Sequence, residues 1–140
     1  MVYTKKRTFL IFSLAFFAKI RIKGAVTYIM AEEKQFENKV KRYLETVGVY
    51  SLGTPRDKMP VEPVGYYEKR WGGFMTKSGL PDLHVCIHGH SIEVELKAEH
   101  GRLSAMQKFM LHQINMSGGK AIVVYPADFD KFKDLVETYL

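Results

Sequence analysis

The stretch 78-SGLPDLHVCIHGHSIEVELKAEHGRLSAMQ-107 contains two short segments whose side chains alternate between apolar and polar. The apolar positions are Leu83, Val85 and Ile87 in the first segment and Ile92, Val94 and Leu96 in the second. Because successive side chains of a strand point to opposite faces, this alternation predicts two strands, each with one buried face. Gly89 permits a tight turn between them, so the stretch predicts a β-hairpin.

The position of the turn decides which polar residues of the hairpin lie opposite one another. With Gly89 and His90 as the central turn residues, the pairs on the polar face are Asp82–Lys97, His84–Glu95 and Cys86–Glu93. Asp82 and Glu95 are then diagonal neighbours with backbones about 7–8 Å apart, so that both carboxylates can reach one cation. A slip by one residue would bury the charged face, and the apolar pattern opposes it.

Two other interpretations of the hairpin stay open at this point. Its charges can be solvated surface pairs worth about 0–1 kcal/mol, although this does not explain why Gly79-x-Pro81-Asp82 leads into a strand. A zinc site is the second alternative, with ligands from His84, His88, His90 and Cys86. These four residues are spaced along a strand and a turn, an arrangement that does not readily converge on one ion.

The residues before the hairpin predict a helix, a loop and a strand. Residues 31–47 carry apolar side chains at helical spacing, namely Phe36, Val40, Leu44 and Val47, and Gly48 can end the helix. Residues 51–63 hold three of the five prolines and predict a loop. Residues 64–70 predict a strand, which Trp71-Gly72-Gly73-Phe74 would break.

The residues after the hairpin complete an α/β pattern. Ser104 and Gln107 form a capping box at the start of a helix whose expected apolar face is Met106, Phe109, Met110 and Ile114. Residues 121–125 predict a buried strand, and residues 128–140 predict a last helix. The order helix, three strands, helix, strand, helix predicts a mixed central sheet flanked by helices.

Composition places limits on the kind of protein. A chain of 140 residues is large enough for one domain with a real core. The single Cys86 excludes an intrachain disulfide framework and a cysteine-rich zinc site. The formal net charge is +6, but residues 1–29 contain six Lys and Arg and no Asp or Glu, so the remainder is neutral. The overall basic charge is therefore no argument for nucleic-acid binding.

Residues 1–29 differ from the rest of the chain. Lys5-Lys6-Arg7 precede the apolar run Phe9–Ala18, an arrangement similar to the start of a secretory signal. The run is too short for a membrane span of about 20 residues, and no clear cleavage site follows it. We expect residues 1–29 to be an extension, weakly structured at best and outside the fold, and residues 30–140 to be the domain. No stable membrane association is expected.

Four blocks of this sequence resemble the VRR-NUC branch of the PD-(D/E)xK nuclease superfamily, which is often found in bacteriophages. The blocks are FENKVKRYL, YYEKRWGGFMTKSGLPDLHV, IEVELKAEHGRLSAMQ and SGGKAIVVYPADFDKF, within residues 33–140. A lone PD…ExK pattern recurs by chance, whereas the ordered set with G-x-PD, ExK, GRLS and Gln is far more specific. The resemblance implies a restriction-endonuclease-like core and an endonuclease that hydrolyses phosphodiester bonds with Mg²⁺ or Mn²⁺.

The resemblance also implies roles for particular residues. Asp82 and Glu95 match the metal-binding acids, and the backbone carbonyl of Leu96 would add a ligand. Lys97 matches the lysine that positions or activates the attacking water, and Gln107 matches a downstream site residue. On helical spacing alone Glu37 is best explained as an i,i+4 pair with Lys41, whereas the resemblance places it near the metal.

Expectations about partners rest on analogy with the same family. They are branched DNA as substrate, as for Holliday junction resolvases, a homodimer, and a location in the cytoplasm of a bacterium or a phage-infected host. The candidate DNA contacts are Lys69, Arg70, Lys77, Ser78 and Arg102. The alternative function is a non-catalytic DNA-binding or interaction module on a nuclease fold.

Overall fold

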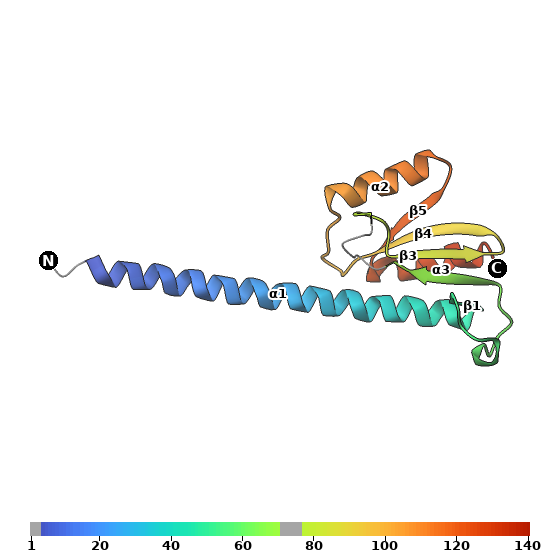
Figure 1. Cartoon of the computed structure of the whole chain (residues 1–140), viewed down its shortest axis with the longest axis horizontal. Helices are drawn as coiled ribbons and strands as arrows, with labels where there is room; N and C mark the ends of the chain where they lie inside the picture. Colours follow the sequence, from blue (N-terminus) through green and yellow to red (C-terminus); the bar gives the residue numbers. More distant parts are fainter. Residues whose placement is uncertain (1–3, 71–76) are drawn as a thin grey trace.

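The computed structural model describes the backbone of residues 4–70 and 77–140 and, within these ranges, the side chains from residue 22 onward. Its elements are α1 (Thr4–Thr46), β1 (Val49–Ser51), β2 (Gly65–Lys69), β3 (Leu83–Ile87), β4 (His90–Leu96), α2 (Ala105–Met116), β5 (Lys120–Val124) and α3 (Phe129–Glu137), shown in Figure 1. Short 3₁₀ turns, η1 (Arg56–Lys58) and η2 (Pro126–Asp128), lie in the connections. The residues expected to end the strand, 71–74, lie outside the described residues.

The five strands form one mixed sheet in the order β1-β2-β3-β4-β5. The central strands β2, β3 and β4 are antiparallel neighbours, and the outer strands β1 and β5 each pair in parallel. The expected α/β class with a mixed sheet flanked by helices is confirmed, and it is consistent with a restriction-endonuclease-like core. The expected order lacked β1, because three residues are too few to show an alternating pattern.

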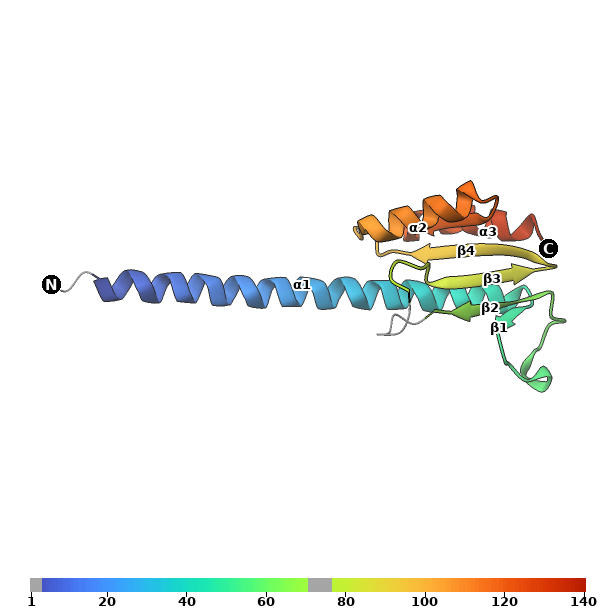
Figure 2. The same cartoon turned by 45° about the horizontal axis from the view of Figure 1, so that its top comes forward.

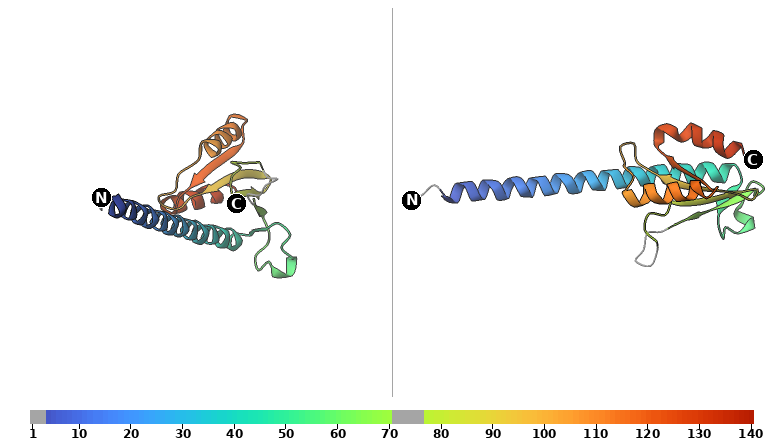
Figure 3. Two further views of the ribbon diagram at one scale, coloured as in Figure 1. Left: turned by 60° about the vertical axis from the view of Figure 1, so that its left-hand side comes forward. Right: turned by 90° about the horizontal axis from the view of Figure 1, so that it is seen from above.

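Helices cover the two faces of the sheet unequally. Buried residues of α1 and α3 pack on the apolar face of the strands, and Phe129 of α3 makes edge-to-face contacts with Phe36 and Tyr43 of α1. The single helix α2 lies on the other face, beside β5 (Figures 2 and 3). The polar side of β4 is therefore enclosed near α2.

Helix α1 is longer than the sequence suggested. It begins at Thr4 instead of residue 31, and it continues without a break into the part that packs on the sheet. The side chains of residues 22–30 are all exposed, and this part projects away from the domain (Figure 1). Among the described residues, none of the helices combines the length and apolar character of a membrane span. The assignment of residues 1–29 as an extension outside the fold stays a prediction.

The hairpin forms with the predicted faces but in a different register. The turn is at His88 and Gly89, whose φ angles of 46° and 85° suit a two-residue hairpin turn. His84 therefore lies opposite Glu93, and Cys86 lies opposite Ser91. The predicted pairs His84–Glu95, Cys86–Glu93 and Asp82–Lys97 are wrong. The difference is two residues on the partner strand, which leaves the buried and polar faces unchanged.

Helix α2 packs on a narrower face than expected. Met110 and Leu111 are buried and Ile114 is half-buried, whereas Met106 and Phe109 are exposed. The capping box of Ser104 and Gln107 is confirmed, and the side chain of Gln107 points to Glu95. This contact fixes the rotation of the helix, because residues 107, 110, 111 and 114 then face the sheet and residue 109 points outward.

Candidate active site

Asp82 and Glu95 come together where β3 and β4 diverge. The last backbone pair of the two strands is Leu83 with Val94, so Asp82 and Glu95 are the next opposed residues. There the Oδ2 atom of Asp82 accepts a hydrogen bond of 2.9 Å from the backbone N–H of Leu96. The side chain of Asp82 thus replaces a strand carbonyl as the acceptor. The two carboxylates are directly opposed rather than diagonal, which brings them closer than the sequence predicted.

Glu95 is the most deeply buried acid of the pair, with 1% of its surface exposed. Its Oε1 atom accepts hydrogen bonds from Lys97 Nζ at 2.8 Å and from Gln107 Nε2 at 2.5 Å. Burial raises the pKa of Glu95, and the negative charge of Asp82 raises it as well, while Lys97 lowers it. Two carboxylates that repel one another at this point form a place where a cation is stabilised.

Lys97 links Glu95 on β4 to helix α1. Besides Glu95, its Nζ atom lies 3.7 Å from Glu33 Oε1 on α1. Burial lowers the pKa of Lys97. Its bond to Glu95 and the charges of Glu33 and Asp82 raise the pKa by more, so the net shift is upward. Lys97 is therefore held as a cation next to the acids.

Glu37 takes part in the same cluster through lysines. Its Oε2 atom lies 2.8 Å from Lys69 Nζ, and its Oε1 atom lies 2.5 Å from Lys41 Nζ and 3.0 Å from Lys34 Nζ. Lys69 Nζ is also 3.3 Å from Asp82 Oδ1. The expected pair with Lys41 is present, and Glu37 is also linked to Asp82 through Lys69. The sequence placed Lys69 among candidate DNA contacts, whereas the structure places it inside the cluster.

Protonation of Glu37 should lower the stability of the fold. Burial raises the pKa of Glu37, but hydrogen bonds from Lys41, Lys69 and Lys34 outweigh burial and lower the pKa from 4.5 to about 2. A lowered folded-state pKa stabilises the fold above pH 4.5, and this stabilisation is lost as the pH falls towards 2. Glu37→Gln should therefore reduce the free energy of unfolding at pH 7 by on the order of 3 kcal/mol.

Denaturant unfolding of both proteins at pH 7 and pH 3 checks this prediction. The difference between wild type and Glu37→Gln should shrink at pH 3. Asp130→Asn is the control, because Asp130 also has a lowered pKa through Lys133 but is exposed. An equal difference at both pH values would contradict the role given to the three lysines.

The donor set at Asp82 and Glu95 fits a hard divalent cation. In an extended strand the N–H and C=O groups of one residue point to the same side, so the Leu96 carbonyl faces the side from which its N–H bonds Asp82. Two carboxylates and one carbonyl are the oxygen ligands that Mg²⁺ and Mn²⁺ prefer. Within the described ranges, no three His, Cys, Asp or Glu residues are grouped to hold a metal. Water or substrate oxygens would complete the coordination, and a histidine–cysteine zinc site has no support.

The remaining candidate DNA contacts differ in whether they are exposed or bound to another side chain. Arg70 makes a bidentate ion pair with Glu93, whose Oε1 atom also lies 2.7 Å from His84 Nδ1. Lys77, Ser78 and Arg102 are exposed. Sequence reasoning missed Glu33, whose spacing of four residues before Glu37 was the available signal.

The loop that leads to Asp82 rests on α2. Gly79 has a φ of +83°, and a Cβ atom placed on it would lie 2.5 Å from Cγ of Met106. A side chain at this position would therefore push the loop away from the helix. The glycine of the G-x-PD sequence thus allows the close approach that sets the position of Asp82 beside Glu95.

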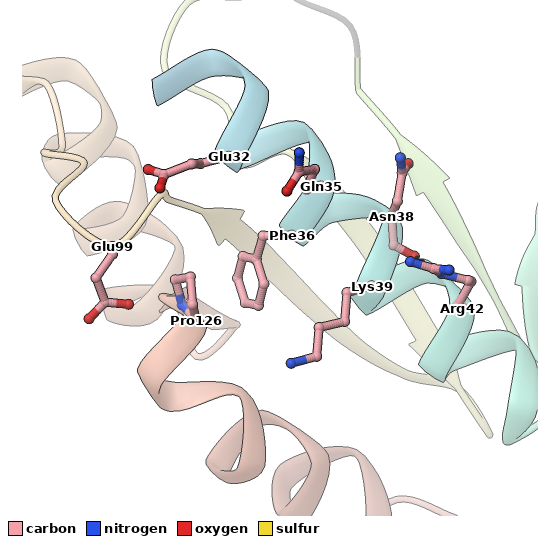
Figure 4. A pocket seen from close by; sticks show the side chains of 8 residues that line it. All are labelled: Glu32, Gln35, Phe36, Asn38, Lys39, Arg42, Glu99 and Pro126. Atoms are coloured by element: carbon pink, nitrogen blue, oxygen red, sulfur yellow. Dashed lines mark hydrogen bonds between the residues drawn. The ribbon is translucent and has the colours of Figure 1, made fainter. Parts of the chain in front are cut away.

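A separate groove of about 550 Å³ lies between α1 and the 3₁₀ turn η2. Phe36, Lys39 and Arg42 of α1 line it together with Glu99 and Pro126, as Figure 4 shows. Lys39 Nζ lies 4.4 Å from the centre of the Phe129 ring, so part of this lining serves packing between α1 and α3. The groove does not include Asp82, Glu95 or Lys97, which remain the candidate active site.

Comparisons of the chain with models of protein families, with curated proteins and with solved structures found no significant match.

Proposed function

We propose that this chain is a metal-dependent DNA endonuclease of the VRR-NUC branch of the PD-(D/E)xK superfamily. The observation that carries the proposal is the direct opposition of Asp82 and Glu95 at the diverging ends of β3 and β4, with Lys97 bonded to Glu95. A pair of acids and a charged lysine in one partly buried place suits phosphodiester hydrolysis with a divalent metal.

Each residue of the site has a task in this proposal. Asp82, Glu95 and the Leu96 carbonyl hold Mg²⁺ or Mn²⁺, which when bound lowers the pKa of water and offsets charge on the phosphate. Lys97 hydrogen-bonds the attacking water or a phosphate oxygen, because its cation is fixed beside Glu95. Gln107 holds the rotamer of Glu95 through its 2.5 Å bond. Lys69 positions Asp82, and Glu37 positions Lys69.

Branched DNA is the proposed substrate, cut by a homodimer in the cytoplasm of a bacterium or a phage-infected cell. The support is the resemblance to stand-alone VRR-NUC proteins, together with the exposure of Lys77 and Arg102, which lie five residues before Asp82 and five residues after Lys97 in the sequence. Since residues 30–140 carry no net charge, a single copy offers no broad basic surface. Two copies would place the exposed cations on one junction.

One observation favours the alternative of a non-catalytic binding module. Asp82, Glu95 and Glu37 each contact a lysine, so the cluster neutralises itself. Against this alternative, both bonds to Glu95 are made to one oxygen, Oε1, and the other carboxylate of the pair keeps one oxygen on a backbone N–H. These contacts hold both carboxylates in fixed positions on opposed strands, which charge neutralisation alone does not require.

A substrate panel tests the proposed function. The full-length chain is incubated with labelled four-way junctions, flaps, blunt duplexes and single strands, with Mg²⁺, with Mn²⁺ and with EDTA. We expect cleavage with either metal, none with EDTA, and the fastest cleavage on a branched substrate. Metal-dependent binding without cleavage of any substrate would favour the non-catalytic module instead.

A further inference from the structure

The outward side of α2 exposes large apolar side chains directly beside the active site. Phe109 is 53% exposed, Met106 48% and Met116 74%. Phe109 and Met116 are seven residues apart and therefore lie on one side of the helix, opposite the side of the buried Met110 and Leu111. Several large apolar side chains exposed together on one helix can mark an interaction surface.

The same region of the chain lacks negative charge. Residues 100–127 contain no Asp or Glu, and they include Arg102, Lys108 and Lys120. All three of these cations are exposed, and so is His112, which lies between Phe109 and Met116 on the helix. Residues 30–140 carry no net charge as a whole, so the acids that balance these three cations lie outside residues 100–127. The local field of α2 therefore attracts a polyanion.

The start of α2 lies beside the catalytic residues. Gln107, next to Met106 and Lys108, bonds Glu95, and Met106 packs against Gly79 in the loop before Asp82. With a rise of about 1.5 Å per residue, the outward face from Phe109 to Met116 is about 11 Å long. This length matches a few nucleotides of an extended strand leading away from the site.

We propose that the outward face of α2 binds unpaired nucleotides of the DNA substrate, with a base stacked on Phe109 and the backbone held by Lys108 and Arg102. Aromatic side chains interleaved with cations form such platforms, because every base has a π-face. The proposal rests on the proposed nuclease function, and it names the feature of branched DNA that the protein selects, namely the unpaired bases at a junction or flap.

Binding measurements on the full-length chain test the surface. Fluorescence anisotropy is recorded in EDTA, so that no strand is cut, with a labelled oligothymidylate single strand and a blunt duplex. Phe109→Ala should weaken single-strand binding about five- to tenfold and duplex binding less than twofold. Phe109→Trp should retain the affinity. Leu52→Ala, which truncates a 58% exposed side chain far from α2, should change neither.

Salt dependence provides a second measurement. Lys108→Ala should reduce the slope of log affinity against log salt by about 0.7 for the single strand, because one phosphate contact is lost. Single-strand affinity that is unchanged by Phe109→Ala would overturn the proposal. It would also be overturned if Phe109→Ala converted a dimer to a monomer in light scattering and weakened both DNA forms equally, since the face would then bind a second copy.

The cleavage panel separates failure of this inference from failure of the proposed function. Metal-dependent cleavage with Phe109→Ala binding like wild type contradicts only the α2 surface. Phe109-dependent single-strand binding without any cleavage contradicts only the nuclease, and it supports the surface.

Discussion

Asp82→Asn should slow DNA cleavage by at least about 10³-fold while leaving the fold intact. The asparagine oxygen can still accept the hydrogen bond from Leu96 N–H, so the loop and strand ends should stay in place. The negative charge that opposes Glu95 is lost, however, and with it one ligand for the divalent cation. Single-turnover cleavage of the preferred substrate measures the effect, and circular dichroism and thermal unfolding confirm the fold.

Asp57→Asn is the matched control for this prediction. Asp57 is an exposed aspartate on the 3₁₀ turn η1, remote from the site, and its substitution should leave the rate unchanged. If Asp82→Asn cleaved DNA within a few-fold of wild type, Asp82 would not belong to the catalytic site.

Lys97→Met should reduce cleavage by about 10²–10³-fold. The methionine fills a similar volume but removes the cation that bonds Glu95 and would face the phosphate. Because Lys97 lowers the pKa of Glu95, its removal should also raise that pKa, so the acidic limb of the pH–rate profile should move to higher pH. The measurement is single-turnover cleavage across a pH series.

Two further variants separate charge from geometry at Lys97. Lys97→Arg keeps the cation and should keep the acidic limb in place, even where its larger head group lowers the rate. Lys131→Met removes an exposed lysine of α3 that pairs with Asp128, and it should have no effect. A Lys97→Met profile with an unshifted acidic limb would show that Lys97 does not control the charge of Glu95.

The sequence was sufficient for features that depend on local pattern. Alternation along the hairpin predicted both of its faces, and the spacing of Phe36, Val40 and Leu44 predicted the buried side of α1. The capping box of Ser104 and Gln107 formed as predicted, because it needs only a spacing of three residues. These predictions hold because neighbouring residues determine them.

Features that depend on the meeting of distant segments were predicted less well. The hairpin register could not be fixed, since Gly89 suits either position of a two-residue turn and both registers preserve the faces. The position of Lys69 between Glu37 and Asp82 depends on how α1 crosses the end of the sheet. The exposure of Phe109 depends on the rotation of α2, whose apolar residues lie on more than one side.

The most direct test of the account is whether Asp82 and Glu95 act as one site. Single-turnover cleavage with Mg²⁺ is measured for Asp82→Asn, for Glu95→Gln and for the protein with both changes. When two residues act as a unit, removing either one already removes the contribution of both. The double variant should therefore be no slower than the slower single variant. Losses that multiply in the double variant, or single variants that cleave at the wild-type rate, would contradict a shared catalytic site at the ends of β3 and β4.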